Sequence, residues 1–257
     1  VAQALRKDWH IICPDLRGYG RSGCPASTPD HAPYAKRAMA EDMIDAMAHL
    51  GFARFHVAGH DRGGRVGYRL ALDHPQHVDR LAVLDVLPTA SVWKRADARF
   101  ALSYWPWSLL AQAEPLPERI LATLADAIVD NALGQWGSPE RAFDPHVRAA
   151  YVEALRDPTH AHAICEEYRA AATLDREQDR ADLEAGRRIA CPLLPLWSAR
   201  GPLGTWYAEG GGPLGVWRHW AREVDGCPVE AGHFFPEEDP QQTANMLLRF
   251  FSTAKCS

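Results

Sequence analysis

The chain has 257 residues, a length that fits one large domain or a domain with an inserted lid. Hydrophobic residues make up 47% of it and charged residues 24%, which allows a sizeable core, and the net charge of −5 argues against a nucleic-acid-binding surface. No apolar run is long enough to span a membrane, and the first residues lack the pattern of a signal peptide.

The first third of the chain alternates between strand and helix patterns. In one helical stretch Met39, Met43 and Met47 recur at helical spacing, and Gly51 ends it. The elements predicted are, in order, a strand at residues 9–13, a helix at 38–50, a strand at 55–58, a helix at 66–72 and a buried strand at 81–85.

The middle of the chain, residues 88–186, contains helical patterns and no strand pattern. Ile120, Leu124 and Ile128 share one stripe of a helix expected at 118–133. Strand patterns return afterwards, although Pro195 is awkward inside a central strand because it lacks an N–H donor. The elements expected there are a strand at 192–197, a short strand at 229–231 and a helix at 240–251, with the repeated Gly-Pro-Leu-Gly at 201–204 and 212–215 interpreted as a flexible loop.

Strand–helix alternation predicts an α/β fold, with a mostly parallel sheet and helices on both faces. Residues 1–87 and 187–257 are expected to form the two parts of this core. Residues 88–186 are expected to form an all-helical cap, inserted after the strand that ends at Asp85. Such a cap would cover the carboxyl edge of the sheet, where ligands bind in open α/β folds.

The spacing Gly59-x-Asp61-x-Gly63 is that of a nucleophile elbow, with an acid in the place usually taken by serine. A strand, a sharp glycine-rich turn and a helix would expose the Asp61 carboxylate at the top of the sheet. A carboxylate nucleophile forms an ester with the carbon that it attacks, which favours substitution at carbon or epoxide opening. The alternative interpretation of the motif is a plain β-turn.

His233 and Asp85 are the expected partners of Asp61. Hydrolysis of the ester needs a base, and the base needs an orienting acid. Asp85 ends a strand on the same edge as the elbow, whereas residues 198–201, which follow the next long strand, contain no acid. The chain order nucleophile, acid, histidine is that of α/β-hydrolases.

Arg62 and Arg65 follow the nucleophile by one and four positions. Two guanidiniums near a buried nucleophile could hold a small carboxylate substrate, and they would lower the pKa of Asp61. The alternative is that Arg65 pairs with a surface acid and Arg62 supplies only its backbone N–H.

Two other patterns carry less weight. Gly18, Gly20 and Gly23 form a GxGxxG pattern, but prolines follow instead of the helix that a dinucleotide site needs. His160 and His162 lie near Cys165 without a fourth metal ligand, and a helix is the better interpretation. Six cysteines without CxxC spacing indicate reduced thiols in a cytoplasmic protein: Cys13, Cys24, Cys165, Cys191, Cys227 and Cys256.

The motifs at residues 15–22, 59–65, 84–89 and 232–234 resemble those of haloacetate (fluoroacetate) dehalogenases of the α/β-hydrolase superfamily, and so do the cap segments 111–118 and 166–170. The similarity covers nearly the whole chain, and its most specific part is the His-Asp-Arg-Gly-Gly-Arg run at 60–65. The resemblance implies a small halogenated carboxylic acid as substrate, no cofactor or metal, and a homodimer. It assigns the catalytic roles to Asp61, Asp85 and His233, carboxylate binding to Arg62 and Arg65, and halide binding to Trp107 and Tyr168.

The chain departs from that family at two places. Pro106 stands where the family has a halide-binding histidine, so one donor to the leaving halide is lost and fluoride release is the activity most affected. The family's first strands and their His-Gly loop have no counterpart before residue 9, so the N–H of Arg62 is left as oxyanion donor.

The sequence therefore predicts a dehalogenase that converts a haloacetate to glycolate through an ester on Asp61. One alternative is an epoxide hydrolase with the same triad. It would need two tyrosines to polarise the epoxide oxygen, and the candidates are Tyr104, Tyr151 and Tyr168. A further alternative is an inactive remnant that binds small carboxylates.

Overall fold

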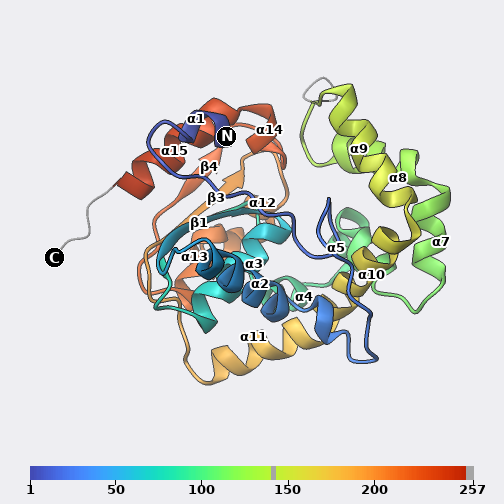
Figure 1. The fold of residues 1–257 in the computed structure, drawn as a ribbon, viewed down its shortest axis with the longest axis horizontal. Helices are drawn as coiled ribbons and strands as arrows, with labels where there is room; N and C mark the ends of the chain where they lie inside the picture. The colour runs from blue at the N-terminus through green and yellow to red at the C-terminus, as the bar shows by residue number, and fades with distance from the viewer. Residues whose placement is uncertain (140–142, 253–257) are drawn as a thin grey trace.

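The computed structural model describes residues 1–139 and 143–252, and it contains the predicted α/β architecture (Figure 1). Four parallel strands form one sheet in the order β1-β2-β3-β4. The strands are β1 Phe55–His60, β2 Val78–Leu84, β3 Leu193–Ser198 and β4 Cys227–Val229.

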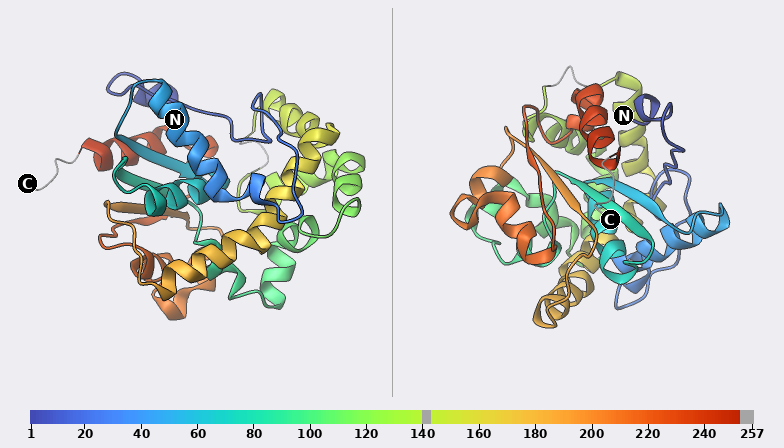
Figure 2. Two further views of the ribbon diagram at one scale, coloured as in Figure 1. Left: turned by 60° about the horizontal axis from the view of Figure 1, so that its bottom comes forward. Right: turned by 90° about the vertical axis from the view of Figure 1, so that its left-hand side faces the viewer.

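Helices cover both faces of this sheet (Figure 2). Leu81 and Val83 of β2 belong to a core that includes residues of α2, α3 and α13, whereas Ala82 and Leu84 point to a second core with α1, α14 and α15. The alternation follows from the two-residue period of a strand. These helices are α1 Ala2–Leu5, α2 Lys36–His49, α3 Arg62–Asp73, α13 Gly212–Trp220, α14 Phe235–Glu238 and α15 Pro240–Ser252.

Between β2 and β3 the described residues form helices and connecting loops without a strand. In Figure 1 the helices α7, α8 and α9 lie farthest from the sheet, which is the arrangement of a helical insert. The domain boundaries drawn at residues 88 and 186 stay predictions. The inserted helices are α4 Thr89–Trp93, α5 Ala98–Ser103, α6 Trp105–Leu110, α7 Leu116–Thr123, α8 Ala125–Gln135, α9 Pro145–Arg156, α10 Pro158–Ala172 and α11 Leu174–Glu184. Shorter elements outside the insert are η1 Ala32–Tyr34, α12 Leu203–Trp206 and η3 Ala208–Gly210.

The strand predicted at residues 9–13 is wrong. The Trp9 ring lies edge-on against His56 of β1, with 5.0 Å between ring centroids, so the segment runs beside the sheet. Among the described residues, however, no backbone hydrogen bond joins it to a neighbouring strand. Apolar residues alone do not make a strand, because a strand exists only through a ladder with a partner.

Two further expectations in the helical regions are corrected. The helix expected at 118–133 is broken at Leu124, where ψ is 25°, because its halves pack in different places: Leu121 joins the main core, while Val129 joins a separate cluster. Both Gly-Pro-Leu-Gly copies lead into helices instead of forming a loop. Leu203 of the first copy begins α12, and the second copy begins α13, which fully buried Trp217 and Trp220 anchor.

Pro195 does lie inside the central strand β3, opposite Val83 of β2. On the other side of β3, a Cβ at Gly226 would lie 1.9 Å from the carbonyl oxygen of Pro195. The glycine therefore lets the chain entering β4 approach a strand position that cannot donate a hydrogen bond.

Candidate active site

Asp61 occupies the turn between β1 and α3, with φ of 45°. Its N–H donates to the carbonyl of Leu84 at 3.1 Å, which ties the turn to the neighbouring strand. The turn leaves no room for a side chain at Gly59, where a Cβ would lie 2.2 Å from the carbonyl oxygen of Gly63. A positive φ at a non-glycine residue is strained, and this strained turn presents the Asp61 side chain to the cavity.

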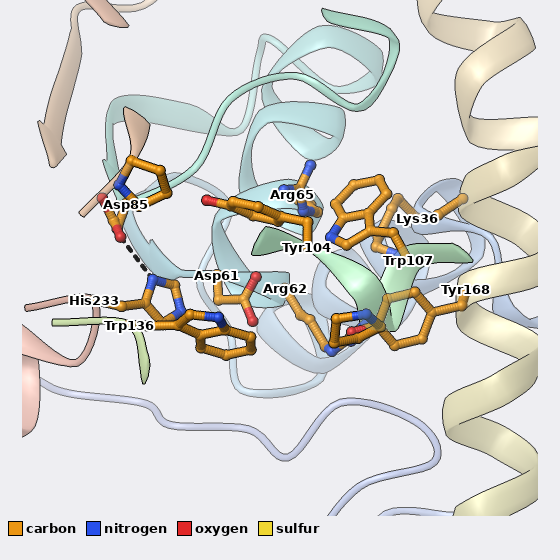
Figure 3. Close-up of a pocket in the computed structure, with 13 residues that line it drawn as sticks. Lys36, Asp61, Arg62, Arg65, Asp85, Tyr104, Trp107, Trp136, Tyr168 and His233 are labelled. Atoms are coloured by element: carbon orange, nitrogen blue, oxygen red, sulfur yellow. Dashed lines mark hydrogen bonds and ion pairs between the residues drawn. The ribbon is translucent and has the colours of Figure 1, made fainter. Parts of the chain in front are cut away.

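His233 lies beside Asp61, and Asp85 orients it (Figure 3). The Nδ1 atom of His233 is 2.6 Å from Oδ2 of Asp85, and the other oxygen of Asp85 accepts the Ser198 N–H at 2.8 Å. Burial lowers the pKa of His233, but the hydrogen bond and charge of Asp85 outweigh it, so that this pKa is raised above its ordinary value. The imidazole is thus oriented and made more basic, as a general base requires.

The carboxylate of Asp61 is held in its ionised form. Burial would raise its pKa, but Arg62, His233 and Arg65 together lower the pKa to about 2. An ionised carboxylate in a site shielded from water is a competent nucleophile.

The two arginines have different partners. Nη1 of Arg62 forms an ion pair with Glu167 at 2.9 Å. Arg65 is 5% exposed, and its Nη1 donates to the carbonyl of Leu87 at 2.9 Å and to the hydroxyl of Thr89 at 3.4 Å. Arg65 forms no ion pair with any carboxylate in the part of the chain that the structure describes, so the expected alternative of a surface pair does not apply.

Each arginine lies over one of the two rings expected to bind halide. The Arg62 guanidinium is 4.1 Å from the centroid of Tyr168, and the Arg65 guanidinium is 4.5 Å from the centroid of Trp107. The two rings contact each other edge to face at 6.2 Å. Pro106 lines the same cavity from the start of α6 and, as a proline, offers no N–H.

These side chains enclose one small cavity of about 40 Å³. A single water occupies about 10–15 Å³ on this measure, so the space suits a molecule of a few non-hydrogen atoms. The structure thus brings together all seven residues predicted for the site. The lining residues are Lys36, Asp61, Arg62, Arg65, Asp85, Tyr104, Pro106, Trp107, Trp136, Tyr168, Ala171, Pro202 and His233.

Three polar residues near the cavity were not predicted from the sequence. Lys36 and Glu167 are 1% and 0% exposed and lie 2.7 Å apart, and the hydroxyl of Tyr19 donates to Glu167. A lysine that begins an amphipathic helix is typical of a solvated surface, so no local signal marks Lys36. Glu167 falls in the segment 166–170 that resembles the dehalogenase family, which is the one signal that could have found it.

Of the three tyrosines considered for epoxide chemistry, Tyr104 and Tyr168 line the cavity. Tyr151 is 38% exposed and donates to Glu237 instead.

Within the residues that it describes, the structure does not form the metal site that His160, His162 and Cys165 could have suggested. In residues 1–139 and 143–252 no group of three or more potential metal ligands gathers, and Nδ1 of His160 donates to the carbonyl of Gly18. Cys13, Cys24, Cys165, Cys191 and Cys227 are free thiols, and Cys256 lies outside the described residues. No helix in the described structure has the length and apolarity needed to cross a membrane.

Comparison with known proteins agrees with this architecture. Residues 1–222 match the α/β-hydrolase fold family. Fluoroacetate dehalogenase from Burkholderia sp. is 40% identical over 99% of this chain and 82% of its own length, and soluble epoxide hydrolase from Corynebacterium sp. (strain C12) is 29% identical over 98% and 84%. The crystal structure of an α/β hydrolase from Nostoc sp. PCC 7120 superposes with a TM-score of 0.88 at 42% identity, covering 93% of this chain and 80% of the other.

Proposed function

The chain belongs to the α/β-hydrolase family and is related to fluoroacetate dehalogenase, and from that premise we propose that it hydrolyses a haloacetate to glycolate and halide. The observation that carries the proposal is the buried Arg65 guanidinium in the cavity of Asp61, without a carboxylate partner among the described residues. A buried cation is stabilised by a counter-charge in direct contact, and Asp61, although Arg65 lowers its pKa, lies beyond ion-pair distance. The carboxylate of a small substrate would supply that counter-charge and would place the adjacent carbon over Asp61.

In the first step an oxygen of Asp61 attacks the halogen-bearing carbon from the side opposite the halogen. The new carbon–oxygen bond forms as the carbon–halogen bond breaks, and the halide leaves with the bonding electrons. Trp107 and Tyr168 line the cavity and carry the N–H and O–H groups that would receive it. The product of this step is an ester between Asp61 and the acetate unit.

In the second step His233 removes a proton from a water that attacks the ester carbonyl of Asp61. The imidazolium that forms is stabilised by Asp85 at 2.6 Å, and it returns the proton to the departing glycolate oxygen. The N–H of Arg62 is placed after the nucleophile, where it can donate to the oxyanion. The balance is one water consumed and glycolate, halide and one proton released.

Because of Pro106, the leaving halides that we propose are chloride and bromide. Fluoride is the halide most dependent on hydrogen-bond donors, and Pro106 adds no N–H donor beside Trp107 and Tyr168.

Two measurements test the proposal. Chloroacetate should release chloride with the wild-type chain, and a single turnover in H₂¹⁸O should label Asp61 and leave the glycolate unlabelled. In the His233→Asn variant the ester should accumulate and add mass to the peptide that bears Asp61. An unmodified peptide, or ¹⁸O appearing directly in the first glycolate, would exclude the covalent mechanism.

Epoxide hydrolysis is the second candidate function, because Tyr104 and Tyr168 line the cavity and could polarise an epoxide oxygen. The 29% identical Corynebacterium relative is named an epoxide hydrolase. Arg65 counts against it, because this guanidinium forms no ion pair with a carboxylate of residues 1–139 and 143–252 and a neutral epoxide would not supply one. Epoxide turnover without halide release would establish this candidate, and carboxylate binding without either reaction would establish an inactive binding protein.

We also propose a cytoplasmic location for the protein. The five free cysteines support the cytoplasmic location expected from the sequence. The homodimer implied by the resemblance stays a prediction.

A further inference from the structure

Two guanidiniums lie near the nucleophile, yet neither closes onto it. In the described structure no ion pair within 4.0 Å joins Asp61 to Arg62 or to Arg65, although both charges act on the pKa of Asp61. Opposite charges in a buried site attract strongly, so something must hold the guanidiniums away.

Arg62 is adjacent to Asp61 in sequence and is held from the cap side. Its Nη1 lies 2.9 Å from Glu167, and its guanidinium lies over the Tyr168 ring at 4.1 Å. In Figure 3 Asp61 lies between His233 and Arg62, and Tyr168 stands on the far side of Arg62. Glu167 and Tyr168 are consecutive residues of α10, so one turn of this helix holds the guanidinium.

Glu167 is itself fixed by two donors from the core. Nζ of Lys36 lies 2.7 Å from one carboxylate oxygen and 3.4 Å from Asp175, and the Tyr19 hydroxyl donates to the oxygen that faces Arg62. Arg62 and Lys36 together lower the pKa of Glu167 to about 2 against the effect of burial. The carboxylate is therefore charged and has little freedom to move.

Tyr19 belongs to the glycine-rich turn that was rejected as a dinucleotide site. Gly18 and Gly20 have φ of 82° and 56°, values that favour glycine. A Cβ at Gly18 would lie 2.7 Å from the Cβ of Ala163 in α10, so the turn packs directly on the cap helix. The two glycines thus bring the Tyr19 hydroxyl to Glu167.

We propose that Glu167, set in place by Tyr19 and Lys36, is a positioning residue that holds the Arg62 guanidinium off Asp61. This inference rests on the proposed function for its activity readout. When Glu167 is neutral, Arg62 swings onto the nucleophile, which loses its freedom to attack, and the guanidinium is no longer presented to the substrate acid.

A double-mutant cycle tests this role. Glu167→Gln should lower kcat/KM for chloroacetate about 100-fold, the usual scale for a small misplacement in an active site. Arg62→Gln should lower it about 10-fold, on the scale of one weakened charge-assisted contact. The double variant should recover to the Arg62→Gln level, because the guanidinium that would close onto Asp61 is gone. Losses that multiply to about 1000-fold would mean independent effects and would overturn the proposal.

Binding of acetate separates this inference from the proposed function. Its dissociation constant, followed by tryptophan fluorescence, needs no turnover, and the same recovery in the double variant is expected there. If the wild-type chain releases no halide but the acetate cycle recovers, the dehalogenase proposal fails and the positioning role holds. If halide is released and acetate affinity falls multiplicatively, the positioning role fails.

Tyr19→Phe is the milder variant if Glu167→Gln unfolds the chain. It removes only the hydroxyl on Glu167 and should lower kcat/KM by several-fold. Tyr34→Phe is the matched control, because Tyr34 is 1% exposed and donates to the carbonyl of Pro25 at 2.7 Å, away from Arg62. Equal losses in the two phenylalanine variants would contradict the proposal.

Discussion

Replacing Arg65 with glutamine should cost more activity than the same change at Arg62. Arg62 already shares its charge with Glu167 at 2.9 Å, whereas Arg65 is held by neutral oxygens and lies over Trp107. A substrate carboxylate therefore gains more from Arg65. One or two charge-assisted hydrogen bonds are worth about 3 kcal/mol in total.

At about 1.4 kcal/mol for each factor of ten, Arg65→Gln should lower kcat/KM for chloroacetate by about 100-fold. Arg62→Gln should lower it by about 10-fold, because the ion pair with Glu167 reduces what Arg62 gains from a substrate carboxylate. The assay is chloride release at several substrate concentrations, together with the dissociation constant of acetate. Thermal unfolding of both variants controls for loss of structure.

A larger loss at Arg62 than at Arg65 would refute this reasoning. It would show that Arg62, which is already paired with Glu167, contributes more to carboxylate recognition than Arg65 does. Equal losses in both variants would refute it as well, because Glu167 would then have no effect on the strength of the second contact.

Three other outcomes are expected. Pro106→His should raise fluoride release from fluoroacetate relative to chloride release from chloroacetate, measured as a ratio of kcat/KM values, because an imidazole donor is added to the halide wall; an unchanged ratio would show that this position does not face the leaving group. The kcat profile should have an acid limb, since His233 must be neutral to act as base, and Asp85 should place that limb at higher pH because its hydrogen bond and charge raise the pKa of His233; a kcat that stays level as the pH falls would contradict this role. The free energy of unfolding should fall as the pH drops from 6.5 towards 4. Burial lowers the pKa of His60 to about 4 in the folded chain, so the unfolded chain binds that proton more readily over this range. Chemical unfolding at several pH values should show a flatter acid dependence for His60→Gln than for the wild type.

The residues closest to the chemistry were predictable because their signals are local. The elbow places Asp61 at a fixed distance from Gly59, a position that must be glycine because the turn has no space for a Cβ there. Asp85 and His233 were found from strand ends and chain order, both of which follow from the parallel sheet. The structure places all three around one cavity.

The other features of the fold and site depend on contacts between residues far apart in the chain, which a short stretch of sequence does not reveal. Lys36 resembles any solvated lysine until α10 and α11 bring Glu167 and Asp175 against it. The break at Leu124 arises because the two halves of an otherwise continuous helical pattern bury against different clusters. The segment at 9–13 has strand composition, yet composition does not supply the hydrogen-bonded neighbour that a strand requires.

The buried pair of Lys36 and Glu167 crosses from the core to the cap, and this has a consequence for shuffling segments between homologues. A chimaera that takes its helical insert from a homologue without an acid at position 167 would remove the closer carboxylate of Lys36, which is 1% exposed, and would leave Asp175 at 3.4 Å as the one remaining ion-pair partner in the described structure. Breaking such a buried pair costs about 3–5 kcal/mol, a large part of the stability of an ordinary domain. Directed recombination of this scaffold should therefore transfer positions 36 and 167 as a unit, and lineages in which one has changed are expected to have changed the other.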